Sequence, residues 1–236
     1  MSKNIYRNKG FKDNIVISIA GAHGIGKTTI YNLLKKEVGD NSKFKFFPER
    51  YKKIPPFSFG SKDKQIAFRS EIHFLQQLIK RNRSVLHFDD RYNGRILILD
   101  RTPLCVLIYS KSLNLKEKDF ALILDTYNSI KWKENYIIHL TANPDIILKR
   151  IIQRGSLDKL RREWNEDDNN YLLTILAYYK QYLSTKNNVF TIDTNDLSPI
   201  EVVDKIKTII TDLSDYSFEK IEQSATTQMN LDKFLK

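Results

Sequence analysis

An apolar run, a glycine-rich turn and an amphipathic segment follow one another near the start of the chain, and this order constrains the fold most. Residues 15–20 read IVISIA, residues 21–28 read GAHGIGKT, and apolar residues recur at helical spacing from Ile30 to Val38. The pattern predicts a strand, a loop and a helix. The glycines let the loop turn several N–H groups inward, and the helix points its positive end at the same place. We therefore expect the loop to bind phosphate groups.

Two side chains at the end of this loop, Lys27 and Thr28, complete the predicted phosphate site. Lys27 supplies a positive charge for the β- and γ-phosphates of ATP, and the Thr28 hydroxyl suits a Mg²⁺ ion bound to them. We expect no catalytic role for the imidazole of His23, because phosphoryl transfer at such a loop does not require one. The residues predicted to bind ATP are Gly21, Ala22, His23, Gly24, Ile25, Gly26, Lys27, Thr28 and Thr29.

Further strand patterns follow along the chain, each separated from the next by helical patterns. The strands are expected at residues 43–47, 96–99, 136–140 and 189–192. This order predicts an α/β P-loop NTPase fold, with about five parallel strands covered by helices on both faces. We expect residues 14–213 to form the domain, after a basic lead-in of residues 1–13 and before a polar extension of residues 214–236.

The overall charge narrows the choice of partners. The chain of 236 residues has 39 Lys and Arg against 28 Asp and Glu, a formal net charge of +11. An excess of this sign favours nucleotides, nucleic acid or a membrane surface. No apolar run approaches the roughly 20 residues that span a bilayer, and residues 1–7 lack the apolar core of a signal peptide. We therefore expect a cytoplasmic protein.

Charged residues directly follow two of the predicted strands. Asp100 and Arg101 follow the buried-type strand 96–99, where a carboxylate forms the second half of a P-loop nucleotide site beside Mg²⁺. Glu49 and Arg50 follow the strand 43–47. Open α/β sheets bind their ligands at the carboxyl ends of the strands, so all four residues are candidates for the site.

A basic segment later in the chain is expected to cover the phosphates. Residues 143–145 read NPD, which combines a capping side chain, a proline and an early acid and so predicts a helix start. That helix runs into a dense basic stretch that Gly155 interrupts. We expect a lid at about residues 150–163, from which Arg150 and Arg154 reach the phosphates.

On these motifs the chain resembles the thymidylate kinases and their relatives among nucleotide and nucleoside kinases, over residues 14–213. Asp100-Arg101-Thr102 with Tyr109 is similar to that family's D-R-Y…A-Y-Q pattern, and residues 143–163 are similar to its lid helix. The chain departs from the family at residues 47–51, where FPERY replaces E-P-G-G-T. The resemblance implies phosphoryl transfer from ATP with Mg²⁺ as cofactor. Glu49 with Asp100-Arg101 also resembles the deoxynucleoside kinases, in which this acid serves as base and the paired arginine orients it.

The acceptor decides the remaining roles. Our main expectation is phosphorylation of a nucleoside monophosphate, dTMP to dTDP, because the lid pattern and the surplus of arginine suit an anionic acceptor. Arg50, Arg83 and Arg101 would hold that phosphate. The alternative is a deoxynucleoside kinase in which Glu49 takes the proton of a 5′-hydroxyl. Gln76 and Tyr109 are candidates for the pocket of the acceptor base.

A second alternative belongs to another class, a P-loop ATPase that binds nucleic acid. The charge of +11 and the basic ends of the chain favour it. The Lys and Arg clusters that can be placed lie near the expected nucleotide cleft, so we disfavour it. The expected partner is a small nucleoside or nucleoside monophosphate and not a membrane, and a homodimer is left open.

Overall fold

Five parallel strands form a single sheet at the centre of the computed structural model, which describes residues 13–49, 60–153, 165–214 and 216–218. The strand order is β2-β3-β1-β4-β5. This sheet confirms the predicted α/β P-loop fold. The strands are β1 (Ile15–Ala20), β2 (Phe44–Phe47), β3 (Ile96–Asp100), β4 (Tyr136–Thr141) and β5 (Val189–Asp193).

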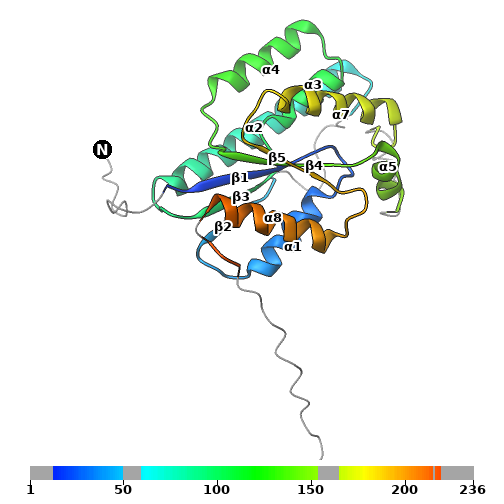
Figure 1. The fold of residues 1–236 in the computed structure, drawn as a ribbon. Coiled ribbons are helices and arrows are strands. Elements are labelled where there is room, and N and C mark those ends of the chain that lie inside the picture. Colours follow the sequence, from blue (N-terminus) through cyan, green and yellow to red (C-terminus); the bar gives the residue numbers. More distant parts are fainter. Residues whose placement is uncertain (1–12, 50–59, 154–164, 215, 219–236) are drawn as a thin grey trace, which may run out of the picture.

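Helices cover both faces of the sheet (Figure 1). One face carries α1 and α8, which pack on each other, and the other carries α2, α3, α4 and α7. Burial on both faces explains why β3 is apolar at each of its first four positions. The helices are α1 (Lys27–Val38), α2 (Lys64–Asp89), α3 (Cys105–Ser112), α4 (Glu117–Ser129), α5 (Pro144–Gln153), α7 (Asn169–Leu183) and α8 (Pro199–Leu213).

Side-chain caps mark the starts of α2, α7 and α8. The predicted capping box of α8 is present, with the Ser198 side chain accepting from the Glu201 N–H and the Glu201 side chain accepting from the Ser198 N–H. Helix α2 continues past the expected end near Arg83 as far as Asp89. The reason is that Val85 and Asp89 are buried and extend the packed face of the helix by two turns.

The strand order brings the predicted site regions to one edge of the sheet. From β1 the chain passes to β2, β3 then fills the place between them, and β4 and β5 add on the other side of β1. Such a reversal creates a crevice at the carboxyl ends of the strands, which is where open α/β sheets bind ligands. The loop after β1, Glu49 after β2 and Asp100 at the end of β3 all lie at this edge.

The predicted C-terminal extension starts as a packed segment. The rings of Tyr216 and Phe218 contact Phe44 of β2, with centroid distances of 4.9 and 5.7 Å. The Asn41 side chain donates to the Tyr216 hydroxyl at 2.8 Å. In the described part of the chain, no helix combines the length and the apolar character needed to cross a membrane.

Candidate active site

The loop after β1 has a backbone that depends on glycine. Gly24 and Gly26 have φ angles of 76° and 105°, in the left-handed region that side chains disfavour. A Cβ on Gly24 would also lie 2.5 Å from the Ile151 side chain of α5. Gly26 is the N-cap of α1, so the positive end of that helix faces the concave side of the loop. The loop thus has the form expected of a phosphate cradle.

Lys27 lies inside this loop. Its side chain is buried, and its ammonium donates to the carbonyl oxygens of Gly21 at 2.9 Å and Ala22 at 2.8 Å. Burial, aided by the charge of Arg101, lowers the pKa of Lys27 to about 7, against the opposing charges of Asp100 and Glu49. An anion bound in the loop would favour the charged form of the lysine.

Thr28 and Asp100 offer oxygen ligands beside the loop. The Thr28 hydroxyl donates to Asp100 Oδ2 at 3.2 Å, while Oδ1 of this buried carboxylate has no hydrogen-bond partner among the described residues. The part of the chain described here holds no cluster of three or more His, Cys, Asp or Glu residues suited to a metal. Mg²⁺ in nucleotide sites usually takes one or two protein oxygens together with phosphates and water. Thr28 and Asp100 therefore fit a Mg²⁺ ion that arrives with ATP.

Glu49 and Arg101 form an ion pair next to Asp100. Arg101 Nε lies 2.8 Å from Glu49 Oε2. Arg101 has a φ angle of 77°, in the left-handed region. Its side chain contacts Glu49, whereas the side chain of Asp100 contacts Thr28. Burial raises the pKa of Glu49 above its usual range, although Arg101 opposes the shift. A buried carboxylate oriented by an arginine suits the role of a general base.

Tyr109 and His23 support the loop from the other side. The Tyr109 hydroxyl accepts a hydrogen bond from the His23 N–H at 2.9 Å. The His23 ring stacks on Tyr171 of α7 at 5.8 Å, and its Nε2 lies 3.1 Å from the Glu166 carbonyl oxygen. Because its hydroxyl is bonded to the loop, Tyr109 is placed to support the phosphate cradle, and this contact lends no weight to the predicted role in a base pocket.

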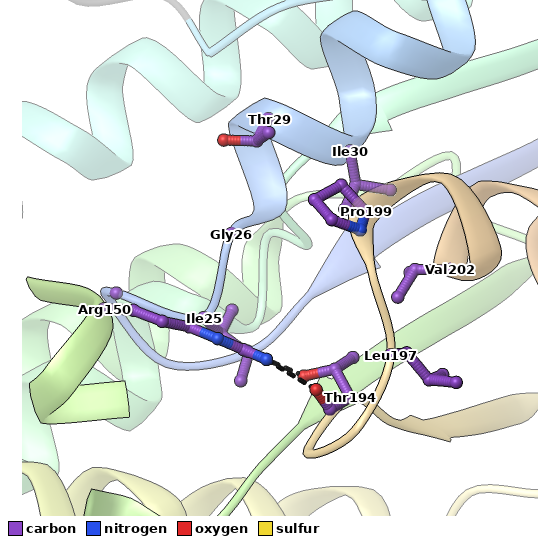
Figure 2. Close-up of a pocket in the computed structure, with 10 residues that line it drawn as sticks. Ile25, Gly26, Thr29, Ile30, Arg150, Thr194, Leu197, Pro199 and Val202 are labelled. Atoms are coloured by element: carbon purple, nitrogen blue, oxygen red, sulfur yellow. Dashed lines mark hydrogen bonds between the residues drawn. The ribbon is translucent and has the colours of Figure 1, made fainter. Parts of the chain in front are cut away.

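A pocket opens between the phosphate loop and the segment that joins β5 to α8 (Figure 2). Arg150 of α5 reaches across it and donates to the Thr194 hydroxyl at 2.9 Å and to the Thr194 carbonyl oxygen. Leu197, Pro199 and Val202 give it an apolar wall, as Figure 2 shows. An apolar pocket with one arginine next to a phosphate loop suits the base and sugar of ATP. The pocket is lined by Gly24, Ile25, Gly26, Thr29, Ile30, Arg150, Thr194, Leu197, Pro199 and Val202.

Other predicted site residues are not brought to this site. Gln76 and Arg83 are exposed on α2. Arg50 and Arg154, together with most of the predicted lid, lie outside the described residues. Of the arginines expected to bind an acceptor phosphate that lie within the described residues, Arg83 is exposed on α2, and Arg101 lies at the site, where it is paired with Glu49.

Sequence reasoning missed two charged residues on the buried face of α2. Glu71 and Arg81 have exposed fractions of 3% and 2%. Burial raises the pKa of Glu71 to about 8, with Arg101 lowering it and Glu49 raising it. Both residues fall on the helical stripe of Ala67, Leu75 and Leu78, so charge within an apolar stripe was the signal that could have revealed them.

A phosphate loop, a strand-end aspartate and an acid–arginine pair at one sheet edge define a P-loop kinase. The family model of the deoxynucleoside kinases matches residues 17–227. The chain therefore belongs to the deoxynucleoside kinase family and is an ATP-dependent nucleoside kinase.

Solved structures share the fold of this chain. Deoxyadenosine kinase from M. mycoides with the products dCMP and dCDP is 20% identical, with a TM-score of 0.65, and the match covers 85% of this chain and 100% of the other. The same enzyme with bound dATP is 22% identical, with a TM-score of 0.65 and coverage of 84% and 100%. No curated protein sequence matches the chain.

These comparisons decide between the interpretations of the sequence. The predicted kinase activity and the use of ATP are confirmed at the level of the family. The specific resemblance to thymidylate kinases is not supported, and the family favours the alternative in which a nucleoside accepts the phosphoryl group. The segment that distinguishes this chain from the thymidylate kinases is residues 47–51, where FPERY, which contains Glu49, replaces E-P-G-G-T.

Proposed function

We propose that this kinase transfers the γ-phosphoryl group of ATP to the 5′-hydroxyl of a deoxynucleoside, with Glu49 as the general base. The observation that carries the proposal is the buried Glu49 carboxylate, 2.8 Å from Arg101 at the end of β2. A hydroxyl must lose a proton as it attacks phosphorus, and a carboxylate within hydrogen-bond reach can accept it. A monophosphate acceptor instead needs arginines free to bind its phosphate, whereas Arg101, the described arginine predicted for that role and placed beside Asp100, pairs with Glu49.

The residues around the phosphate loop would bind the donor, ATP, and its Mg²⁺ ion. The N–H groups of the loop and Lys27 would hold the phosphates, while Thr28 and Asp100 would bind Mg²⁺, which neutralises the charge of the transferring group when bound. The pocket at Thr194 would hold the adenine and ribose, with Arg150 on its rim. Transfer then depends on positioning and electrostatic stabilisation, which these residues would supply from the loop after β1, from α1, β3 and α5, and from the segment after β5.

Deoxyadenosine and deoxycytidine are the first acceptors to test. The structurally similar kinase from M. mycoides is named for deoxyadenosine and was solved with dCMP and dCDP. We expect Mg-ATP with either nucleoside to give ADP and the nucleoside 5′-monophosphate, as measured by coupled ADP release and chromatography of the product. The panel includes all four deoxynucleosides, their monophosphates and DNA. Turnover with monophosphates alone, or ATP hydrolysis stimulated by DNA alone, would reject the proposal.

The donor pocket gives a separate prediction. Arg150→Ala should raise the KM for ATP about tenfold, because it removes a charged group worth about 1.4 kcal/mol of binding from the rim of the pocket. The kcat should change less, since Arg150 bonds to Thr194 and not to the Glu49–Arg101 pair. Lys149→Ala, an exposed neighbour on the same helix, is the matched control. An unchanged KM for ATP in Arg150→Ala would indicate that the adenine of ATP binds outside this pocket.

A further inference from the structure

We infer that Arg81 is a positioning residue that fixes the turn carrying Asp100 and Arg101; the inference deepens the proposed function and rests on it. The guanidinium comes from the buried face of α2. Its Nη1 donates to the main-chain carbonyl oxygen of Asp100, and its Nη2 donates to that of Arg101 at 2.7 Å. One side chain therefore holds the two successive carbonyls of this turn.

The burial of Arg81 requires an explanation. Its exposed fraction is 2%, and removing a guanidinium from water is costly unless hydrogen bonds compensate for it. Both hydrogen bonds go to backbone oxygens of the turn, and neither goes to a carboxylate. The planar fork of an arginine can reach two neighbouring acceptors at once, which a lysine ammonium on its flexible stem cannot match. The arrangement therefore uses a property specific to arginine.

The turn that Arg81 holds is itself strained. Arg101 has a φ angle of 77°, a left-handed conformation that persists in a residue other than glycine only where surrounding contacts impose it. On the downstream side, the Thr102 hydroxyl donates to Glu134 Oε2 at 3.1 Å and accepts from the Leu104 N–H at 3.2 Å. Arg81 holds the upstream side. Because hydrogen bonds hold the turn on both sides of Arg101, they fix the orientation of the peptide group between residues 100 and 101.

That peptide determines where two active-site side chains point. With the turn as it stands, Asp100 reaches Thr28 at 3.2 Å and Arg101 reaches Glu49 at 2.8 Å. A relaxed turn would rotate both side chains, and displacements of about 1 Å at a reacting centre can cost about a hundredfold in rate. Arg81 contacts neither the loop nor the donor pocket through its hydrogen bonds, so its loss should affect catalysis more than ATP binding.

The test uses the full chain with Arg81→Lys and Arg81→Met, and with Lys80→Met as an exposed control on the same helix. We expect kcat for a deoxynucleoside to fall about a hundredfold in Arg81→Met and about tenfold in Arg81→Lys, with the KM for ATP within about threefold of wild type. Arg81→Lys keeps the charge and should keep the fold by circular dichroism, so it decides the matter if Arg81→Met does not fold. Wild-type kcat in folded Arg81→Lys would overturn the inference.

A binding measurement separates this inference from the proposed acceptor. Calorimetric titration of ATP with and without Mg²⁺ needs no nucleoside. In Arg81→Lys, the gain in ATP affinity that Mg²⁺ gives should be about two- to threefold smaller than in wild type, because Asp100 is displaced. An equal gain in the two proteins would refute the positioning role, even if wild type proved to use another acceptor. A reduced gain would support that role independently of the acceptor.

Discussion

Replacing Glu49 with glutamine should lower kcat for deoxynucleoside phosphorylation by about a thousandfold, within the range of about 10²–10⁴ that a positioned general base contributes. Glutamine has nearly the same shape and can still accept a hydrogen bond from Arg101, but it cannot take a proton. The KM for ATP should stay within about twofold of wild type, because Glu49 lies at the end of β2 and outside the donor pocket. Steady-state kinetics with saturating Mg-ATP measures both constants.

The pH dependence of the same variant tests the assignment further. Burial raises the pKa of Glu49 above the ordinary 4.5, so its protonated form persists to a higher pH than in an exposed glutamate. Activity requires the carboxylate, and kcat/KM of wild type should therefore fall as pH decreases through that raised pKa. Glu49→Gln should lack this acid limb. Retention of the limb, or kcat close to wild type, would assign the base to another residue.

The parts of the site that follow directly from strand ends could be predicted from the sequence. The apolar run 15–20 and the glycines after it specify strand, loop and helix locally, because Gly24 and Gly26 adopt left-handed backbone angles that residues with side chains disfavour. Asp100 could be placed for a similar reason, since it ends a buried parallel strand. These features depend on the order of residues within one short segment.

The orientation of side chains on helices could not be predicted in the same way. The sequence offers several arginines near the expected cleft, and the surplus suggested an anionic acceptor. Arg83 is exposed, whereas Arg81, two positions earlier, is buried beneath the catalytic turn. Two positions on a helix differ by about 200° in direction. If the buried face of the helix is predicted wrongly, a charged residue that is exposed is therefore assigned to the site.

Pairings between distant segments depend on the strand order, and the sequence predicted the pairing of Glu49 with Arg101 only through the resemblance to the deoxynucleoside kinases. Arg150 bonds to Thr194 because α5 follows β4, and β4 is the neighbour of β5 in the sheet. Glu49 pairs with Arg101 because these residues follow the neighbouring strands β2 and β3. The second pairing agrees with the nucleoside alternative, since it makes an arginine that could bind phosphate the partner of a base. The charge balance of the cleft is therefore set by tertiary contacts, and composition alone gave only its sign.

Glu71→Gln should stabilise the protein at pH 8 by a few kcal/mol, or about 5–10 °C in Tm. Glu71 is buried at an exposed fraction of 3%, and burial raises its pKa from 4.5 to about 8. Between these values the unfolded chain releases the proton while the folded chain keeps it. The folded state then binds more protons, so stability falls as pH rises through this window.

Glutamine stays neutral at every pH, and the variant should therefore lose this part of the pH dependence. The measurement is Tm and the free energy of unfolding by urea at pH 5, 6, 7 and 8, for wild type and Glu71→Gln. Asp125→Asn, at an exposed position on α4, controls for the loss of a negative charge from a basic protein. Below about pH 4.5 the two proteins should converge, because Glu71 is then protonated in both states. A constant difference across the whole range would mean that Glu71 is ionised in the folded protein, and that the Arg101 charge outweighs burial at this position.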